Sequence, residues 1–101
     1  MKTLKITPQS GFRVLAGTAR SQVAAMVLQP GESTGGPDNR HATSDQWLYV
    51  VSGEGEAIIN GQKHPLPPGT LLLIEAGESH KILNIGAEPL TTFNIYAPPE
   101  Y

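Results

Sequence analysis

Glycine and proline recur along the whole chain and divide it into short segments. Eleven glycines and nine prolines are spread over 101 residues, and short runs of apolar and β-branched residues lie between them. This pattern is typical of many short strands joined by frequent turns. No helical periodicity extends beyond one or two turns. The sequence therefore predicts an all-β fold, a small antiparallel barrel or sandwich, because closure removes exposed strand edges.

The apolar runs define the predicted strands, and turn-forming residues separate them. Asn60-Gly61 is the strongest short hairpin signal. Four consecutive apolar residues at Leu71–Ile74 indicate a strand buried on both faces. The predicted strands are Leu4–Thr7 and Phe12–Leu15, both short edge strands, then Val23–Leu28, Trp47–Val51, Ala57–Ile59, Gln62–Leu66, Leu71–Ile74, His80–Ile85 and Leu90–Tyr96.

Composition and charge exclude several functional classes. Seven Lys and Arg residues are scattered along the chain and oppose nine Asp and Glu, which argues against nucleic-acid binding. The chain has no cysteine, so a disulfide framework and a thiolate metal site are excluded. No segment approaches the length of a membrane span, and the first residues lack the apolar run of a signal peptide, so we expect a cytoplasmic protein without membrane contact.

Two glycine-bounded stretches, Gly31–Gly53 and Gly69–Asn84, share one arrangement. Each combines a turn-rich loop that carries a histidine with an apolar strand. Two such segments can bring His41, Gln46 and His80 together. The sequence therefore points to a polar site built from both stretches.

The first stretch contains Asn39-Arg40-His41, then four residues, Gln46, six residues and Gly53. This spacing resembles the first motif of the cupin superfamily, Gly-x5-His-x-His-x3,4-Glu-x6-Gly. His41 matches the second histidine of that motif. Asn39 stands where the motif has its first histidine, and Gln46 stands where it has glutamate.

The second stretch resembles the second cupin motif, Gly-x5-Pro-x-Gly-x2-His-x3-Asn, at every spacing. Gly69, Gly77, His80 and Asn84 occupy the motif positions, and Glu75 replaces the proline. The resemblance implies a cupin-type double-stranded β-helix, or jelly-roll, barrel.

The resemblance also implies how the chain is divided. One barrel domain covers residues 1–101, with N-terminal strands in 1–20 and the two motifs at 31–53 and 69–84. In this family, groups that face into the barrel hold a divalent metal, commonly iron, manganese, nickel or zinc.

By this resemblance His41, Gln46 and His80 are the metal ligands, and Asn39 can add a fourth oxygen. Two imidazoles and a neutral amide oxygen would hold a cation less tightly than a set with a carboxylate. The alternatives are two structural histidines, a buried Gln46 amide bonded to backbone, and a loop-capping Asn39. His64 lies outside both motifs and is expected to be a structural or surface residue.

Alternation along the strands predicts an apolar wall around this polar end. The same parity places Trp47, Tyr49, Leu71 and Leu73 on the outside of the barrel. That outer face is expected to pack under the N-terminal strands or to form a homodimer. The predicted pocket residues are Met26, Leu28, Leu48, Leu72, Phe93 and Ile95.

Two functions therefore stand first. One is a metal-dependent oxygenase, isomerase or lyase that acts on a small molecule, and the other is a binding or sensing module without turnover. A purely structural role ranks last, because unpaired inward polar groups would cost stability.

Overall fold

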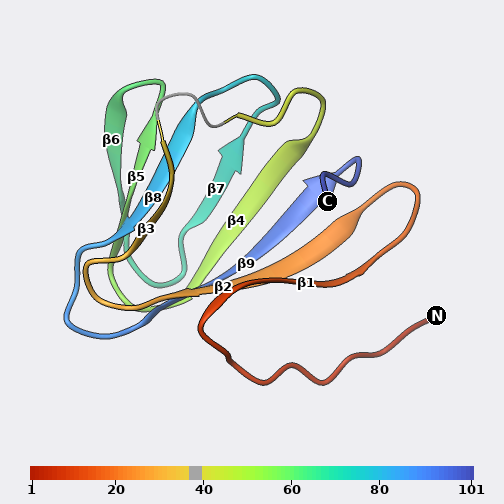
Figure 1. The fold of residues 1–101 in the computed structure, drawn as a ribbon, viewed down its shortest axis with the longest axis horizontal. Coiled ribbons are helices and arrows are strands. Elements are labelled where there is room, and N and C mark those ends of the chain that lie inside the picture. The colour runs from red at the N-terminus through yellow and green to blue at the C-terminus, as the bar shows by residue number, and fades with distance from the viewer. Residues whose placement is uncertain (37–39) are drawn as a thin grey trace.

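The structure is a computed structural model that describes residues 1–36 and 40–101, and two antiparallel sheets face each other in it (Figure 1). One sheet has the order β1-β2-β9-β4-β7, and the other has β3-β8-β5-β6. The described residues form β1 Gly11–Gly17, β2 Gln22–Leu28, β3 Ser33–Gly36, β4 Asp45–Ser52, β5 Gly55–Ile59, β6 Gln62–Leu66, β7 Leu71–Ile74, β8 His80–Asn84 and β9 Leu90–Ala97. None of the described residues belongs to a helix that could cross a membrane.

The all-β prediction is confirmed, and the Asn60-Gly61 hairpin forms as predicted. Both residues have positive φ, +48° and +82°, and Ile59 pairs with Gln62 across the turn. These values suit a tight turn between strands β5 and β6. A local two-residue signal therefore fixes the register of one edge of the smaller sheet.

The predicted strand at Leu4–Thr7 is wrong. This segment is exposed and lies outside every strand, and the carbonyl of Thr7 accepts a hydrogen bond from the Arg13 side chain at 2.9 Å. Strand β3, in contrast, was not predicted, since Ser33–Gly36 has no apolar run. Its backbone pairs with β8 from Ser33 opposite Leu83 to Gly36 opposite His80, so pairing with a neighbour imposes the strand.

The hydrophobic core lies between the two sheets. Along β4, Gln46, Leu48 and Val50 point inward, whereas the residues between them are exposed, as the alternation predicts. The prediction that Leu71–Ile74 is buried on both faces is wrong, because Leu71 is 60% exposed. The core comprises Met26, Leu28, Leu48, Val50, Ala57, Ile59, Leu66, Ile74, Ile82 and Leu90, with Leu72 packed against it.

The predicted register of the last strand is wrong by one residue. Thr92 and Asn94 point into the barrel and are at most 1% exposed, whereas Ile95 is 43% exposed and Phe93 is half-buried on the outer face. The prediction assumed that the apolar residues of this strand face the core. The inward polar side chains are instead stabilised by hydrogen bonds inside the barrel.

Candidate functional site

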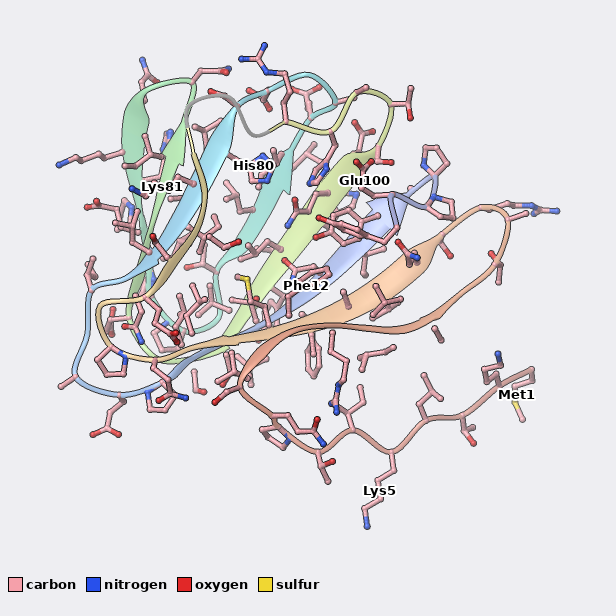
Figure 2. All side chains as sticks on the ribbon, viewed as in Figure 1. Met1, Lys5, Phe12, His80, Lys81 and Glu100 are labelled. Atoms are coloured by element: carbon pink, nitrogen blue, oxygen red, sulfur yellow. The ribbon has the colours of Figure 1, made fainter. Side chains whose placement is uncertain are left out.

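His41, Gln46 and His80 come together between the two sheets, as the motif spacing predicts. His41 precedes β4, Gln46 lies on β4, and His80 begins β8 on the facing sheet, where Figure 2 shows its ring pointing into the barrel. All three are at most 5% exposed, and the two histidine rings lie 4.8 Å apart between centroids. Asn39, the predicted fourth ligand, lies outside the described residues.

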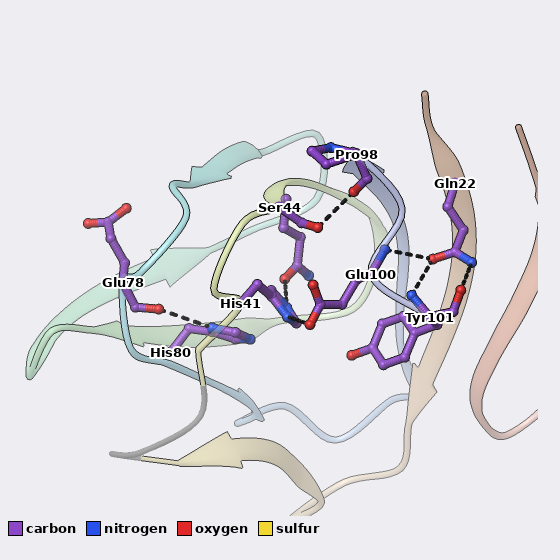
Figure 3. A network of polar contacts seen from close by, with 9 residues as sticks. Gln22, His41, Ser44, Glu78, His80, Pro98, Glu100 and Tyr101 are labelled. Carbon is purple, nitrogen blue, oxygen red and sulfur yellow. Dashed lines mark hydrogen bonds and ion pairs between the residues drawn. The ribbon is translucent and has the colours of Figure 1, made fainter. Parts of the chain in front are cut away.

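His41 contacts two oxygens, one at each ring nitrogen (Figure 3). Its Nε2 lies 3.0 Å from Oε1 of Gln46, and its Nδ1 lies 3.1 Å from a carboxylate oxygen of Glu100. Glu100 belongs to the segment after β9, which carries no recognisable motif. The sequence therefore predicted that His41 and Gln46 lie together but gave no indication that Glu100 contacts His41.

A chain of side-chain hydrogen bonds orients the Gln46 amide. Its Nε2 donates to Oδ1 of Asn94 at 3.0 Å, and Nδ2 of Asn94 donates to Oγ1 of Thr92 at 3.1 Å. Because the amide nitrogen of Gln46 is bonded to Asn94, its amide oxygen faces His41. The alternation of polar residues at Thr92 and Asn94 is the sequence signal that could have revealed this network.

His80 is held as a neutral imidazole near pH 7. Burial lowers its pKa from the ordinary value of 6.5, and the nearby His41 lowers it further. The backbone carbonyl of Glu78, 3.5 Å from Nδ1, and the Glu100 carboxylate oppose this shift but do not reverse it. A neutral ring retains a lone pair on one nitrogen, which a metal ligand requires.

A cavity of about 200 Å³ adjoins these polar groups. Met26 is the one predicted pocket residue that lines it. Leu28, Leu48 and Leu72 belong to the packed core instead. All six predicted pocket residues are described, and the cavity is lined by Phe12, Met26, Thr34, Gln46, His80, Ile82, Tyr96 and Tyr101.

Two buried or partly buried tyrosines form one wall of this cavity. Burial is the main cause that raises the pKa of both Tyr96 and Tyr101. The Tyr96 ring stands edge-on to the His41 ring at 5.2 Å. Both phenols are therefore neutral around pH 7 and offer hydrogen bonds rather than charge to a ligand.

The polar groups of the site fit a cation with a neutral donor set. In the described residues, no three His, Cys, Asp or Glu side chains form a metal cluster, so any such site depends on the Gln46 oxygen. When Nδ1 of His41 donates to Glu100, the lone pair on Nε2 faces the Gln46 oxygen at 3.0 Å. These two atoms are close enough to share a proton, and together with His80 they would hold a divalent cation, which would act there as a Lewis acid.

Three charged or titratable side chains are exposed and do not enter the site. Arg40, Asp45 and His64 all lie on the surface. Asp45 accepts a hydrogen bond from the backbone N–H of Ala76 at 3.0 Å, which joins the start of β4 to the turn after β7. None of these three side chains lines the cavity, which is formed by other residues.

Comparison with known proteins agrees with this architecture. A family model described as a cupin domain matches residues 24–96, which includes both motifs and most of the two sheets. The chain is a member of the cupin family. The crystal structure of BH2720 from Bacillus halodurans has a TM-score of 0.85 and 29% identity, and the match covers 93% of this chain and 74% of that one.

Two curated relatives resemble this cupin over much of its length. YrkC of Bacillus subtilis is 31% identical over an alignment of 97 positions, and the match covers 89% of this chain and 51% of YrkC. The oxalate-binding protein of Thermotoga maritima is 36% identical over 63 residues, which cover 62% of this chain and 50% of the relative. The chain thus spans about half the length of these relatives.

Proposed function

We propose that this cupin binds a divalent metal ion through His41, Gln46 and His80, and a small molecule in the adjoining cavity. The observation that carries the proposal is the pair of donors at the site: Nε2 of His41 lies 3.0 Å from the Gln46 oxygen, while Nδ1 is held by the Glu100 carboxylate. A carboxylate on the second ring nitrogen is the usual support of a ligating histidine, because it fixes the ring and makes Nε2 more basic.

The chemistry of the donors indicates which ions and ligands to expect. Imidazole suits iron, nickel and zinc, and none of the three ligands would neutralise the ion. A bound ion would therefore act as a Lewis acid with its full positive charge and would favour an anionic ligand. A small carboxylate fits a cavity of about 200 Å³, and a relative at 36% identity is named for binding oxalate.

The second candidate is a binding module that works without metal. It is supported by the hydrogen bonds at both ring nitrogens of His41, which protein oxygens can satisfy when both nitrogens carry protons. In that state the histidine is an imidazolium paired with Glu100, and it donates to the Gln46 oxygen. A ligand in the cavity would then contact Gln46, His80 and the neutral tyrosines.

Calorimetric titration of metal-stripped protein at pH 7.5 separates these candidates. We expect zinc, nickel or ferrous ions to bind at one site per chain, and oxalate to bind only after the metal. Binding should release protons, because imidazole ligands must be unprotonated at the nitrogen that holds the metal. Oxalate binding to stripped protein would favour the second candidate, and binding of neither metal nor oxalate would refute both.

We also propose a homodimer, formed through the outer apolar face of β4, β7 and β9. Trp47, Tyr49, Leu71, Leu73 and Ile95 lie there, each at least 37% exposed, and they pair across adjacent strands. Packing by the N-terminal residues does not cover this face, because β1 lies at the opposite edge of the sheet from β7 (Figure 1). Burial of such a face in a second copy removes its apolar area from water.

Sedimentation velocity at micromolar concentration tests the dimer. We expect a dimer for the wild type and a monomer for Leu71→Glu, because a charge buried in an apolar interface is left unpaired. Gln62→Glu changes charge at an exposed position on β6 and should stay dimeric. A monomeric wild type would refute the proposal.

A further inference from the structure

The segment after β9 brings Tyr101 to the wall of the cavity, and hydrogen bonds from Gln22 and Ser44 hold this segment from two sides (Figure 3). Gln22 on β2 accepts hydrogen bonds from the backbone N–H groups of Glu100 and Tyr101 at 3.2 and 2.9 Å, and it donates to the Tyr101 carbonyl at 2.7 Å. The hydroxyl of Ser44 donates to the Pro98 carbonyl at 2.7 Å. Gln22 and Ser44 are both buried, so these bonds are shielded from water.

This anchoring delivers two side chains to the site. The Tyr101 ring lies 5.0 Å from Phe12 and 5.3 Å from Tyr96 between centroids, and it lines the cavity. The Glu100 carboxylate reaches Nδ1 of His41 at 3.1 Å. Gln22 binds the backbone of Glu100 and Tyr101 and not the His41 ring itself, so we expect its effect on that ring to pass through residues 98–101.

Two oxygens compete for the proton of a neutral His41 ring. The Glu100 carboxylate faces Nδ1, and the neutral Gln46 amide oxygen faces Nε2. A hydrogen bond to a charged acceptor is roughly twice as strong as one to a neutral acceptor, so the proton of the neutral ring resides on Nδ1. Nε2 then carries the lone pair toward Gln46 and the neighbouring cavity.

We propose that residues 98–101 form a cap over the cavity and that Glu100 is a positioning residue, which sets the tautomer of His41 through the anchor at Gln22. This proposal concerns the same site as the proposed function, but the tautomer does not depend on whether a metal binds. In this chain the position of the motif glutamate is occupied by Gln46. Glu100 thus supplies a negative charge to the site from a distant part of the sequence.

Nitrogen-15 spectra of the histidine side chains report which ring nitrogen of His41 carries the proton. The spectra are recorded on metal-free protein at about pH 8.5, where an ordinary histidine is neutral. We expect the Nδ1–H tautomer of His41 in the wild type. In Glu100→Ala the Gln46 oxygen is the remaining acceptor, so the Nε2–H tautomer should predominate. Glu100→Gln retains an acceptor at Nδ1 and should give a mixture of the two tautomers.

Two further variants test the anchor. Gln22→Ala keeps Glu100 but removes three hydrogen bonds to the cap, so it should shift His41 toward Nε2–H. Glu54→Ala removes an exposed carboxylate elsewhere and should leave the tautomer unchanged. An unchanged Nδ1–H signal in a folded Glu100→Ala protein would overturn the proposal.

Metal titration of the same proteins keeps this proposal distinct from the proposed function. Loss of a supporting partner of a ligating histidine weakens metal binding by roughly 10- to 100-fold, and we expect that loss in Glu100→Ala. If Glu100→Ala changes the tautomer but the wild type binds no metal, the role of Glu100 is supported and the metal site is refuted. If the wild type binds metal but Glu100→Ala leaves the tautomer unchanged, the metal site is supported and the role of Glu100 is refuted.

Discussion

Gly53→Ala is expected to destabilise the fold by at least about 3 kcal/mol, more than a typical point substitution. Gly53 follows β4 with φ of +90°, a conformation that residues with a Cβ rarely adopt. A Cβ at this position would also collide with the backbone at the start of β9, where it would meet the Pro89 carbonyl oxygen and lie 2.8 Å from Cα of Leu90. Backbone atoms cannot rotate away, so the end of β4 would have to separate from β9.

Gly61→Ala is the matched control. Gly61 has a similar φ of +82°, but nothing lies within 4 Å of a Cβ built there. This variant therefore carries only the strain of positive φ, about 1–2 kcal/mol. Urea unfolding followed by circular dichroism measures both variants, and equal losses would show that the contact with β9 has no effect.

The sequence predicts this fold well where its signals are local. The Asn60-Gly61 turn places β5 against β6, and the alternation along β4 separates the inward Gln46 from the outward Trp47. Motif spacing places His80 opposite His41 on the facing sheet. The first two predictions depend on residues a few positions apart, because strand parity and turn geometry are short-range properties, whereas the placement of His80 depends on the resemblance of both stretches to the cupin motifs.

The sequence predicts less well where a partner elsewhere in the fold decides the outcome. In the middle of the last strand, Phe93 and Ile95 share one parity and Thr92 and Asn94 share the other, and hydrophobicity alone selected Phe93 and Ile95 as the inward pair. The inward Asn94 is tolerated because it accepts from Gln46, 48 positions away, and donates to Thr92. A buried amide with these partners avoids most of the desolvation cost of an unpaired polar group. The prediction that Phe93 and Ile95 point inward did not take these hydrogen bonds into account.

The cap formed by residues 98–101 also depends on partners that are distant in the sequence. Gln22 and Tyr101 are 79 positions apart, and a Pro-rich ending carries no periodicity that would place Glu100 beside a histidine. Once β2 and β9 are neighbours in the sheet, Gln22 lies opposite Tyr96 and within reach of the segment that follows it. The carboxylate of the site is therefore a consequence of sheet order and could not be read from either motif.

His80→Ala is expected to lower metal affinity by more than about 100-fold, since even a supporting partner of a ligand contributes roughly 10- to 100-fold. The matched control is His64→Ala, which removes an exposed imidazole on β6 and should retain the metal. Elemental analysis of the two proteins, loaded side by side at pH 7.5, gives the result. Equal metal content in both variants would show that His80 is not a metal ligand.

Gln46→Glu is expected to act in the opposite direction and tighten metal binding by about tenfold or more, because an anionic oxygen replaces a neutral one beside the cation. The hydrogen-bond chain can accommodate the change. Asn94 can turn its amide so that its nitrogen donates to the new carboxylate, and the Thr92 hydroxyl, now 3.1 Å from Asn94, can donate to the amide oxygen. Every buried polar group then keeps a partner, so a weaker metal site in a folded Gln46→Glu protein would mean that this oxygen is not a ligand.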